Sequence, residues 1–574
     1  MSHHAPKLGL AAFASACLTT LALAGPADDA AYAIIDGEKV DVPKVTMGAP
    51  ATIAAIIEEG SQRNRVMDHL TYLCEEIGPR LTGSSNVEEA NNWVADQFRA
   101  WGLTNVHLDE WGEIGVRFDR GPSSGKVVVA RQRDDDEGNP YTEWVTQREL
   151  QFTTLAWSPG TAGPVRGHVV KMPADEDEYW AVKDKLKGAW VLLQAPQRQR
   201  GVRGSSGSMS GRTQQLAEAR AKVAAGEVEP EDLDLFERIA FDGINGFVST
   251  SRDERIWTTS VRGWRELSYY DLPKDIIIDV TGDDYDYINS RVFDGEAIEL
   301  CFDLRHHFTE GPIKVYNTIG EIRGTEKPEE VVIVSGHLDS WNGPGSQGTV
   351  DNGTGSSVTM EAARILATVG AKPKRTIRFI LWTGEEQGLL GSRDYVERLQ
   401  ASGEIEKISA VFVDDGGTNY EGGITGTPDM VPWLAAATAP VNGVFYSETD
   451  GQHLDVNVKT METFNMSVGG SDHASFVRAR VPGFFWDEVG RANYRYAWHT
   501  QRDRLDQAIE EYLVQSATCA AVTAYNIACA PGLLPRPAEW LNPQEEGQEE
   551  SPGERPQRPE RRGDAAASAT GATR

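Results

Sequence analysis

The sequence predicts an α/β protein with a mostly parallel, mixed β-sheet, covered by helices on both faces, and a separate β-rich insert. From about residue 316 onward, runs of strand-forming residues alternate with amphipathic helical patterns, which is typical of a parallel sheet covered on both sides. Between residues 150 and 310, short apolar strands bounded by glycine replace that alternation. At 574 residues the chain is also too long for a single hydrophobic core.

The main domain is expected to consist of two stretches, residues 61–149 and 311–534, on either side of an inserted domain at 150–310. In the second stretch we expect strands at 317–322, 331–335, 376–382, 408–413 and 483–486, and helices at 356–369, 389–399, 431–438 and 505–530. In the first stretch we expect helices at about 61–77 and 87–101, then strands that continue to about residue 145. In the insert, strands are expected at 165–172, 187–193, 243–248 and 275–280. Outside both domains we expect a lead-in at 25–60 and a disordered tail at 535–574.

The first residues have the pattern of a secretory signal peptide. Lys7 precedes an apolar stretch from Leu8 to Leu23, and Ala22-Leu23-Ala24 offers the small residues that signal peptidase requires. We therefore expect residues 1–24 to be removed and the protein to be exported, either to the periplasm or as a secreted protein; a membrane anchor is the alternative. No later segment has about 18 consecutive apolar residues, so no membrane association is expected after cleavage.

The net charge limits the classes of partner, and the cysteine spacing argues against a zinc finger. A formal net charge of -30 argues against nucleic acid or anionic membrane as a partner, because both repel an acidic surface. Removal of the leader leaves Cys74, Cys301, Cys519 and Cys529, whose spacing matches no zinc-finger pattern. We expect these cysteines to be mostly structural and leave open a disulfide between Cys74 and Cys301.

Histidine and acidic residues follow the ends of the expected strands. The strand at 331–335 runs into His337-Leu338-Asp339, where Asp339 can accept a hydrogen bond from the imidazole of His337 and aim its other nitrogen at a metal. Asp351, in Asp351-Asn352-Gly353, opens a helix, and its two oxygens allow it to bridge two cations. Taken singly, each has a plain alternative: a histidine satisfied at a strand end, or an aspartate that caps a helix or forms an Asx turn.

The most specific single motif is the carboxylate pair Glu385-Glu386, at the end of the strand expected at 376–382. Two adjacent carboxylates repel each other and usually stay solvated. Beside a dication, one of them can bind the metal while the other takes a proton from water. The pair therefore indicates a metal site with a built-in general base.

Two further regions contribute candidate residues. The strand at 408–413 ends in Asp414-Asp415, either of which could bind a metal, and an aromatic-rich loop leads to His499. Ser471-Asp472-His473 begins another helix; His473 could contact substrate, although a surface histidine beside a capping aspartate is nearly as good an interpretation. Because such sheets place their sites beyond the carboxyl ends of their strands, we expect a two-metal hydrolase site there. Its expected members are His337, Asp351, Glu385, Glu386, His499 and one of the two aspartates.

Taken together, these motifs resemble the M28 family of zinc aminopeptidases and carboxypeptidases. The matching segments are Gly336–Trp341, Asp351–Gly353, Thr383–Gly388, Ser471–His473 and Trp498–Thr500, and the loop Gly78–Ser84 is similar as well. The resemblance covers roughly residues 60–140 and 315–530 and implies a zinc aminopeptidase-like fold. The insert resembles a protease-associated domain, mainly through Leu186-Lys187-Gly188 and Gly243–Gly246.

The resemblance implies two Zn²⁺ ions per chain and a role for each matching residue. One zinc would be bound by His337 and Asp415, the other by Glu386 and His499, with Asp351 as the bridging ligand. Asp415 is preferred to its neighbour because the family's ligand is followed by a small residue and then Gly-Thr, as in Asp415-Gly416-Gly417-Thr418. The same resemblance implies that Glu385 is the general base. Asp339 and His473 are expected as further catalytic residues.

Two details of the resemblance concern the backbone and the oxyanion. The peptide bond after Asp351 is often cis in this family. Some members carry a tyrosine just before the Ser-Asp-His run, where this chain has Asn465-Met466-Ser467-Val468. Either His473 or zinc itself is then expected to stabilise the oxyanion of the tetrahedral intermediate.

The implied activity is hydrolysis of short peptides, as an aminopeptidase, a carboxypeptidase or a dipeptidase. A glutaminyl cyclase of the same fold would use a single zinc, and a non-catalytic peptide-binding module would have lost metal ligands. Gly343–Gly348 fits a dinucleotide-binding fingerprint but lies well past its strand. The chain has no G-x-S-x-G and no H-E-x-x-H motif, which argues against a serine hydrolase and a single-helix zinc protease. The insert could restrict the site to short peptides or mediate a homodimer.

Overall fold

The fold is known from a computed structural model that describes residues 31–194, 208–251, 253–464, 466, 469–537 and 540. The expected signal peptide at 1–24 and nearly all of the expected tail at 535–574 lie outside these residues. One compact unit ends at Arg536, and a second segment begins at Pro537. The elements below all belong to the first unit.

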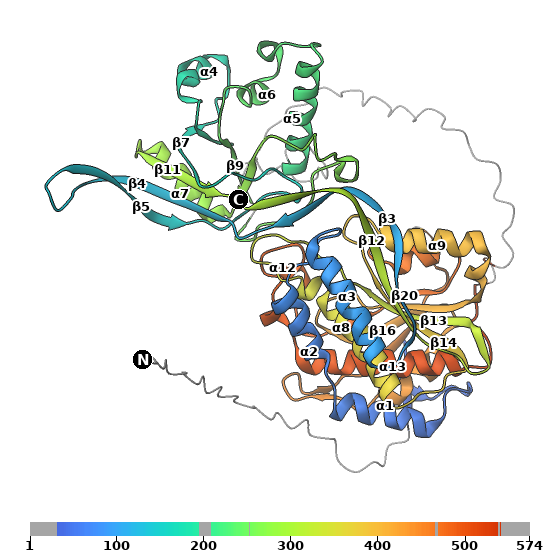
Figure 1. Cartoon of the computed structure of the whole chain (residues 1–574). Helices are drawn as coiled ribbons and strands as arrows, with labels where there is room; N and C mark the ends of the chain where they lie inside the picture. Colours follow the sequence, from blue (N-terminus) through green and yellow to red (C-terminus); the bar gives the residue numbers. More distant parts are fainter. Residues whose placement is uncertain are drawn as a thin grey trace, which may run out of the picture. The chain divides into compact units, whose positions relative to one another are not determined.

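A six-stranded mixed sheet forms the centre of the expected main domain (Figure 1). Its strands, in spatial order, are β20 (Gly483–Phe485), β15 (Ile408–Val413), β13 (Lys327–His337), β14 (Arg375–Trp382), β12 (His306–Ile322) and β3 (Thr104–Arg120). The first four are parallel, and β12 runs antiparallel to both β14 and β3. This confirms the mostly parallel, mixed sheet that the sequence predicts.

Helices cover both faces of this sheet, as the alternating residues of β13 show. Val332 and Val334 belong to the large core that contains residues of α3 (Ser85–Ala100), α8 (Thr354–Thr368) and α13 (Glu510–Cys529). Val331 and Ile333 belong to a second core with residues of α9 (Leu390–Ser402) and α11 (His473–Arg478). Successive strand residues point to opposite faces, so the two cores lie on opposite sides of the sheet.

The lead-in at 25–60 contains regular structure that the sequence analysis did not expect. Strands β1 (Tyr32–Ile35) and β2 (Glu38–Asp41) form a hairpin, and α1 (Pro50–Gln62) follows. The turn residues Asp36 and Gly37 both have positive φ, 50° and 85°, which is the requirement of a tight two-residue hairpin turn. The hairpin joins a five-stranded sheet with β19 (Asn457–Thr460), β16 (Tyr420–Gly426) and β21 (Asp487–Val489).

An eight-stranded sheet contains the strands expected in the insert. Its spatial order is β5 (Pro140–Glu149), β4 (Ser124–Asp134), β11 (Ile298–Asp303), β7 (Val165–Lys171), β8 (Trp190–Leu192), β9 (Gly246–Thr250), β10 (Ile277–Val280) and β6 (Phe152–Thr153). Its helices are α4 (Glu176–Val182), α5 (Met209–Ala224), α6 (Leu235–Ile239) and α7 (Gly282–Phe293). Strand β4 follows β3 within a few residues, and β11 precedes β12 within a few residues. The long paired strands β3 and β12 therefore connect the central sheet to the eight-stranded sheet along the chain.

The remaining elements are short. They are α2 (Val66–Thr71), η1 (Tyr72–Ile77), η2 (Lys183–Lys185), η3 (Pro230–Asp232), η4 (Trp264–Glu266), η5 (Thr349–Gly353), η6 (Glu404–Lys407), α10 (Val431–Thr438), η7 (Ala439–Val441), β17 (Tyr446–Ser447), β18 (Gln452–His453), α12 (Tyr494–Ala497) and η8 (Leu505–Gln507). No helix in the described ranges is long and apolar enough to cross a membrane.

The disulfide left open between Cys74 and Cys301 is not formed. All four cysteines of the described chain are free. The Cys74 sulfur is buried and contacts Thr349 Oγ1 at 3.1 Å instead. This cysteine therefore contacts the first residue of η5.

His306, at the start of β12, makes folding sensitive to acid. Its Nδ1 donates to the Ser158 carbonyl at 2.9 Å and its Nε2 accepts from the Arg120 guanidinium at 3.1 Å, which requires the neutral ring. Burial, reinforced by the Arg120 charge, lowers the pKa of His306 to about 3. In the unfolded chain this histidine binds a proton near pH 6.5, so the free energy of unfolding should fall as the pH drops from there toward 3.

Urea unfolding of wild type and His306→Gln across that pH range checks the prediction, because the variant should lose part of the pH dependence. Parallel curves of stability against pH for the two proteins would contradict it.

Candidate metal centre

Strand ends bring four of the expected site residues to one edge of the central sheet. His337 is the last residue of β13, and Glu385 and Glu386 follow the end of β14. Asp415 follows β15 in the same way. Because β13 is parallel to both of these neighbours, the carboxyl ends of the strands lie together, where polar side chains can leave the sheet.

Asp351 and His499 reach the same place from irregular segments. Asp351 lies in η5 with a non-helical φ of -131°, and its peptide bond to Asn352 is cis, as the family resemblance implies. Asn352 Nδ2 donates to the carbonyl of Asp414 at 2.8 Å, which ties this turn to the end of β15. His499 follows α12 and has a positive φ of 58°.

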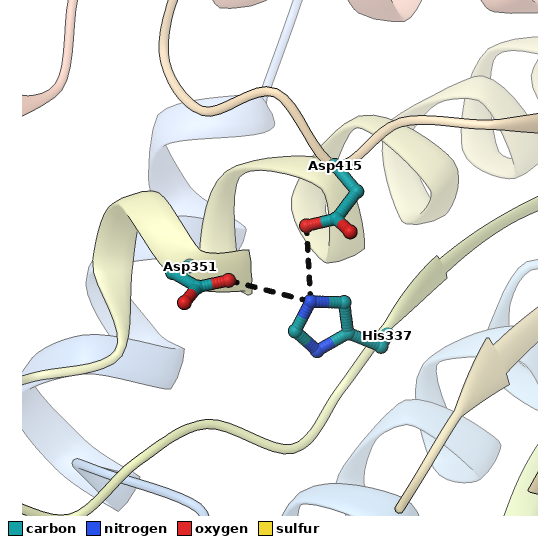
Figure 2. Close-up of side chains that lie close together, drawn as sticks. All are labelled: His337, Asp351 and Asp415. Carbon is teal, nitrogen blue, oxygen red and sulfur yellow. Dashed lines mark hydrogen bonds and ion pairs between the residues drawn. The ribbon is translucent and has the colours of Figure 1, made fainter. Parts of the chain in front are cut away.

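The first group of possible metal ligands is His337, Asp351 and Asp415, whose ligand atoms all lie within 4.8 Å of one another (Figure 2). His337 Nε2 is 3.0 Å from Asp415 Oδ1 and 3.5 Å from Asp351 Oδ1. The other ring nitrogen, Nδ1, donates to the backbone carbonyl of Asp339 at 2.9 Å. That bond holds the Nδ1 proton, so Nε2, which lies nearest the two carboxylates, is the nitrogen that a metal would bind.

The second group is Asp351, Glu386 and His499. His499 Nε2 is 2.9 Å from Glu386 Oε2 and 3.3 Å from Asp351 Oδ2. Asp351 therefore presents one oxygen to each group. Its Oδ2 and Glu386 Oε1 are buried without a hydrogen-bond partner among the described residues. Such orphaned acceptors, together with imidazole nitrogens, fit a divalent transition metal such as zinc.

Glu385 belongs to neither group, although its Oε2 is 3.9 Å from His337 Nε2. The Asp339 carboxylate holds this region in place: it accepts the amides of Glu385 and Glu386 at 3.3 and 3.4 Å and the hydroxyl of Thr82 at 2.8 Å. The structure differs here from the sequence-based expectation. The Asp339 carboxylate is 3.6 Å from His337 Nδ1, too far for a hydrogen bond, and the carbonyl of the same residue accepts that proton.

Buried carboxylates dominate the electrostatics of the centre. Burial, and then the charge of Asp351, raises the pKa of Glu386 well above its usual value. Burial also raises the pKa of Glu385 well above its usual value, although the His337 charge opposes it. The pKa of His337 is raised despite burial, because Asp415 and Glu385 favour the imidazolium. So many carboxyl groups cannot all ionise side by side, whereas bound dications would stabilise every one of them as a carboxylate.

The Ser471–His473 segment reaches the centre through its aspartate. Asp472 is fully buried, neither carboxylate oxygen has a hydrogen-bond partner among the described residues, and burial raises its pKa to about 7. His473 begins α11, its ring packs against Phe485 with centroids 5.4 Å apart, and burial lowers its pKa to about 4. In the described part of the chain no hydrogen bond or ion pair joins His473 to the expected metal ligands. Of the 465–468 stretch, only Met466 is among the described residues.

Tyr494 is a residue of the centre that the sequence analysis missed. Its hydroxyl donates to Asp351 Oδ1 at 3.3 Å. Burial, followed by the charge of Asp351, raises its pKa well above the usual value, so the phenol stays protonated. The aromatic-rich loop before His499 is visible in the sequence, but nothing in the spacing indicates which ring turns toward the carboxylate.

A segment that follows β9 of the eight-stranded sheet holds the loop of His499. The Thr258 amide donates to the His499 carbonyl at 3.0 Å. Gln501 Oε1 accepts the Ile256 amide at 3.0 Å, and its Nε2 donates to the Glu254 carbonyl at 3.0 Å. The region expected as an insert therefore supports one of the possible metal ligands directly.

Known proteins share this fold and these motifs. Residues 317–524 match the model of peptidase family M28. Carboxypeptidase Q of Xenopus laevis is 32% identical over 497 residues, which cover 84% of this chain and 90% of the relative. Carboxypeptidase Q of Rattus norvegicus is 27% identical over 484 residues, covering 83% and 88%. The crystal structure of a peptidase M28 precursor from Shewanella amazonensis SB2B has a TM-score of 0.53 at 22% identity, covering 85% of this chain and 98% of that one, and shares the fold.

The chain belongs to peptidase family M28. It is a metallopeptidase, a hydrolase of peptide bonds. The family resemblance read from the motifs is thereby confirmed, as is the zinc aminopeptidase-like α/β fold. The likeness of the inserted region to a protease-associated domain stays a prediction.

Proposed function

We propose that this protein is an exported exopeptidase that hydrolyses short peptides with two zinc ions per chain. One observation carries the proposal: two ligand groups share Asp351, one oxygen to each, while Glu385 lies beside them and belongs to neither. A shared carboxylate is what a two-metal hydrolase requires, and an unshared one can move protons. Export is proposed from the leader-like residues 1–24.

The residues divide between binding and proton transfer. One zinc would be held by His337 and Asp415, the other by Glu386 and His499, and both by Asp351. When bound, the zinc pair supplies Lewis-acid chemistry: it lowers the pKa of water and polarises the scissile carbonyl. Asp339 orients this set, because its carbonyl fixes the His337 tautomer and its carboxylate holds the amides of the glutamate pair.

Glu385 is the proposed general base. It has a carboxylate free of the ligand groups, and its side chain is 12% exposed, so water and substrate can reach it. It would take a proton from the attacking water and deliver it to the leaving amine.

Metal removal and a substrate panel test the proposal. We expect two zinc ions per chain by elemental analysis, loss of dipeptide hydrolysis on treatment with a chelator, and recovery when zinc is added back. Comparison of free dipeptides with N-blocked and C-amidated peptides identifies which terminus is recognised. One zinc per chain with cyclisation of N-terminal glutamine would favour the cyclase alternative, and peptide binding without hydrolysis would favour a binding module.

Tyr494→Phe should lower kcat/KM about tenfold while both zinc ions stay bound. Loss of the phenol removes one hydrogen bond to Asp351, and a bond to a charged group contributes roughly 1.5 kcal/mol, which is about a factor of ten in rate. Steady-state kinetics with zinc analysis measures this. Tyr496→Phe, on the same short helix, is the matched control and should behave as wild type. Equal effects of the two variants would contradict the role of Tyr494.

A further inference from the structure

The members of the proposed metal centre differ in their exposure to solvent. The side chains of His337, Asp415 and Glu386 are 0%, 4% and 2% exposed, whereas those of Glu385 and His499 are 12% and 17% exposed. A nearby pocket of about 280 Å³ includes none of the proposed ligands in its lining. Glu385 and His499 are therefore the most accessible groups of the centre, and the pocket borders the centre through Tyr494.

Two indole rings lie beside His499, the most exposed of the proposed ligands. Trp498 is 37% exposed, although large aromatic side chains usually bury most of their surface. Its ring stacks on His499, with centroids 3.8 Å apart and an interplanar angle of 23°, so its exposed part lies on the opposite face and the edges. Trp257 meets Trp498 edge-on, with centroids 5.9 Å apart.

Both rings are held firmly by the backbone around them. Trp257 forms an antiparallel bridge with Thr500, next to the bond from the Thr258 amide to the His499 carbonyl. The Arg255 guanidinium lies 5.0 Å from the Trp257 ring centroid, and its charge is paired with Asp253 at 2.7 Å. The Arg255 charge beside the Trp257 ring is therefore already paired.

We propose that Trp257 and Trp498 form an aromatic wall that receives a large apolar side chain of the substrate, on a residue next to the scissile bond. This inference rests on the proposed function and adds a substrate class to it: short peptides with an aromatic or branched aliphatic residue at that position. An apolar side chain gains from contact with an exposed indole face, while a charged or very small one does not. It also gives the inserted region a direct part in specificity, because Trp257 follows β9.

Peptide binding to an enzyme that cannot turn over tests the wall. In zinc-loaded Glu385→Gln protein, calorimetry should show Phe-Ala or Ala-Phe binding at least tenfold tighter than Ala-Ala. Adding Trp498→Ala or Trp257→Ala should remove that preference and leave Ala-Ala binding within about twofold. Adding Trp498→Phe should restore most of it. Trp180→Ala, which removes an exposed tryptophan on α4, is the control and should change nothing.

Other outcomes separate the wall from a structural role. Equal loss of affinity for all three dipeptides, or unchanged preference in both tryptophan variants, overturns the proposal. Zinc content is measured on each variant. Loss of zinc together with an equal loss of binding for all peptides would mean that Trp498 only supports His499, and would also overturn the proposal. Absence of hydrolysis by the wild type would end the proposed exopeptidase function, while the binding preference would still decide whether the wall exists.

Discussion

Replacing Glu385 with Gln should reduce kcat by about 10²- to 10⁴-fold, the usual contribution of a general base, while both zinc ions stay bound. Glutamine has nearly the same shape but cannot accept a proton. Because Glu385 lies outside both ligand groups, its replacement removes proton transfer without removing a ligand. Steady-state hydrolysis of a dipeptide, with zinc measured on the same samples, checks the prediction.

The matched control for Glu385 is Glu397→Gln, an exposed position on α9 in the element that follows the glutamate pair. It makes the same chemical change away from the centre and should leave rate and metal content unchanged. Glu386→Gln gives the complementary result: it removes a proposed ligand, so zinc content should fall toward one per chain. A Glu385→Gln enzyme with near-normal turnover would end the assignment of Glu385 as the base.

The residues that follow strand ends can be predicted from the sequence, because the run of strand-forming residues before each of them is a local signal. His337, Glu385 and Asp415 each follow a run of strand-forming residues, and the parallel arrangement of those strands makes their convergence predictable. The convergence of these residues could therefore be proposed before any coordinates, whereas the division into two ligand groups came from the family resemblance. Asp415 could be separated from its neighbour only through the family resemblance, since local pattern treats two adjacent aspartates alike.

Contacts that depend on tertiary structure could not be predicted in this way. Tyr494 and Asp472 face the centre, yet neither has a spacing that distinguishes it from an ordinary aromatic or helix-start residue. The support of His499 by Thr258 joins chain segments about 240 residues apart, as the neighbouring pair Ile256 and Gln501 shows with a separation of 245 residues. The β1–β2 hairpin was different: its Asp36-Gly37 turn is a local signal that the sequence analysis overlooked.

Replacing Arg80 with Met should destabilise the fold by about 3–5 kcal/mol and weaken zinc binding as well. Arg80 is fully buried, and its guanidinium donates to backbone carbonyls instead of a carboxylate. These acceptors are Leu338 at 2.7 Å, Gly348 at 2.6 Å, Gly78 at 3.0 Å, and Leu73 and Gln347 at 3.3 Å. Methionine fills similar space but cannot donate, so the buried Leu338 carbonyl loses its guanidinium donor, whereas Leu73 and Gly348 keep only the backbone amides of Gly78 and Gly353. A buried acceptor left without a donor is the costly outcome.

The expected effect on zinc follows from which carbonyls Arg80 holds. Leu338 lies between His337 and Asp339, and Gly348 immediately precedes η5, which carries Asp351. One guanidinium thus joins the end of β13 to the turn that presents the shared ligand, so its loss should weaken the binding of both zinc ions together.

Urea unfolding with and without zinc, combined with zinc titration, measures the two effects. Arg131→Met, at an exposed position on β4, is the control. The stability of Arg80→Lys should fall between those of wild type and Arg80→Met, because an ammonium keeps the charge but cannot reach all the carbonyls at once. An Arg80→Met protein whose free energy of unfolding is within about 1 kcal/mol of wild type would show that the hydrogen bonds of Arg80 contribute nothing.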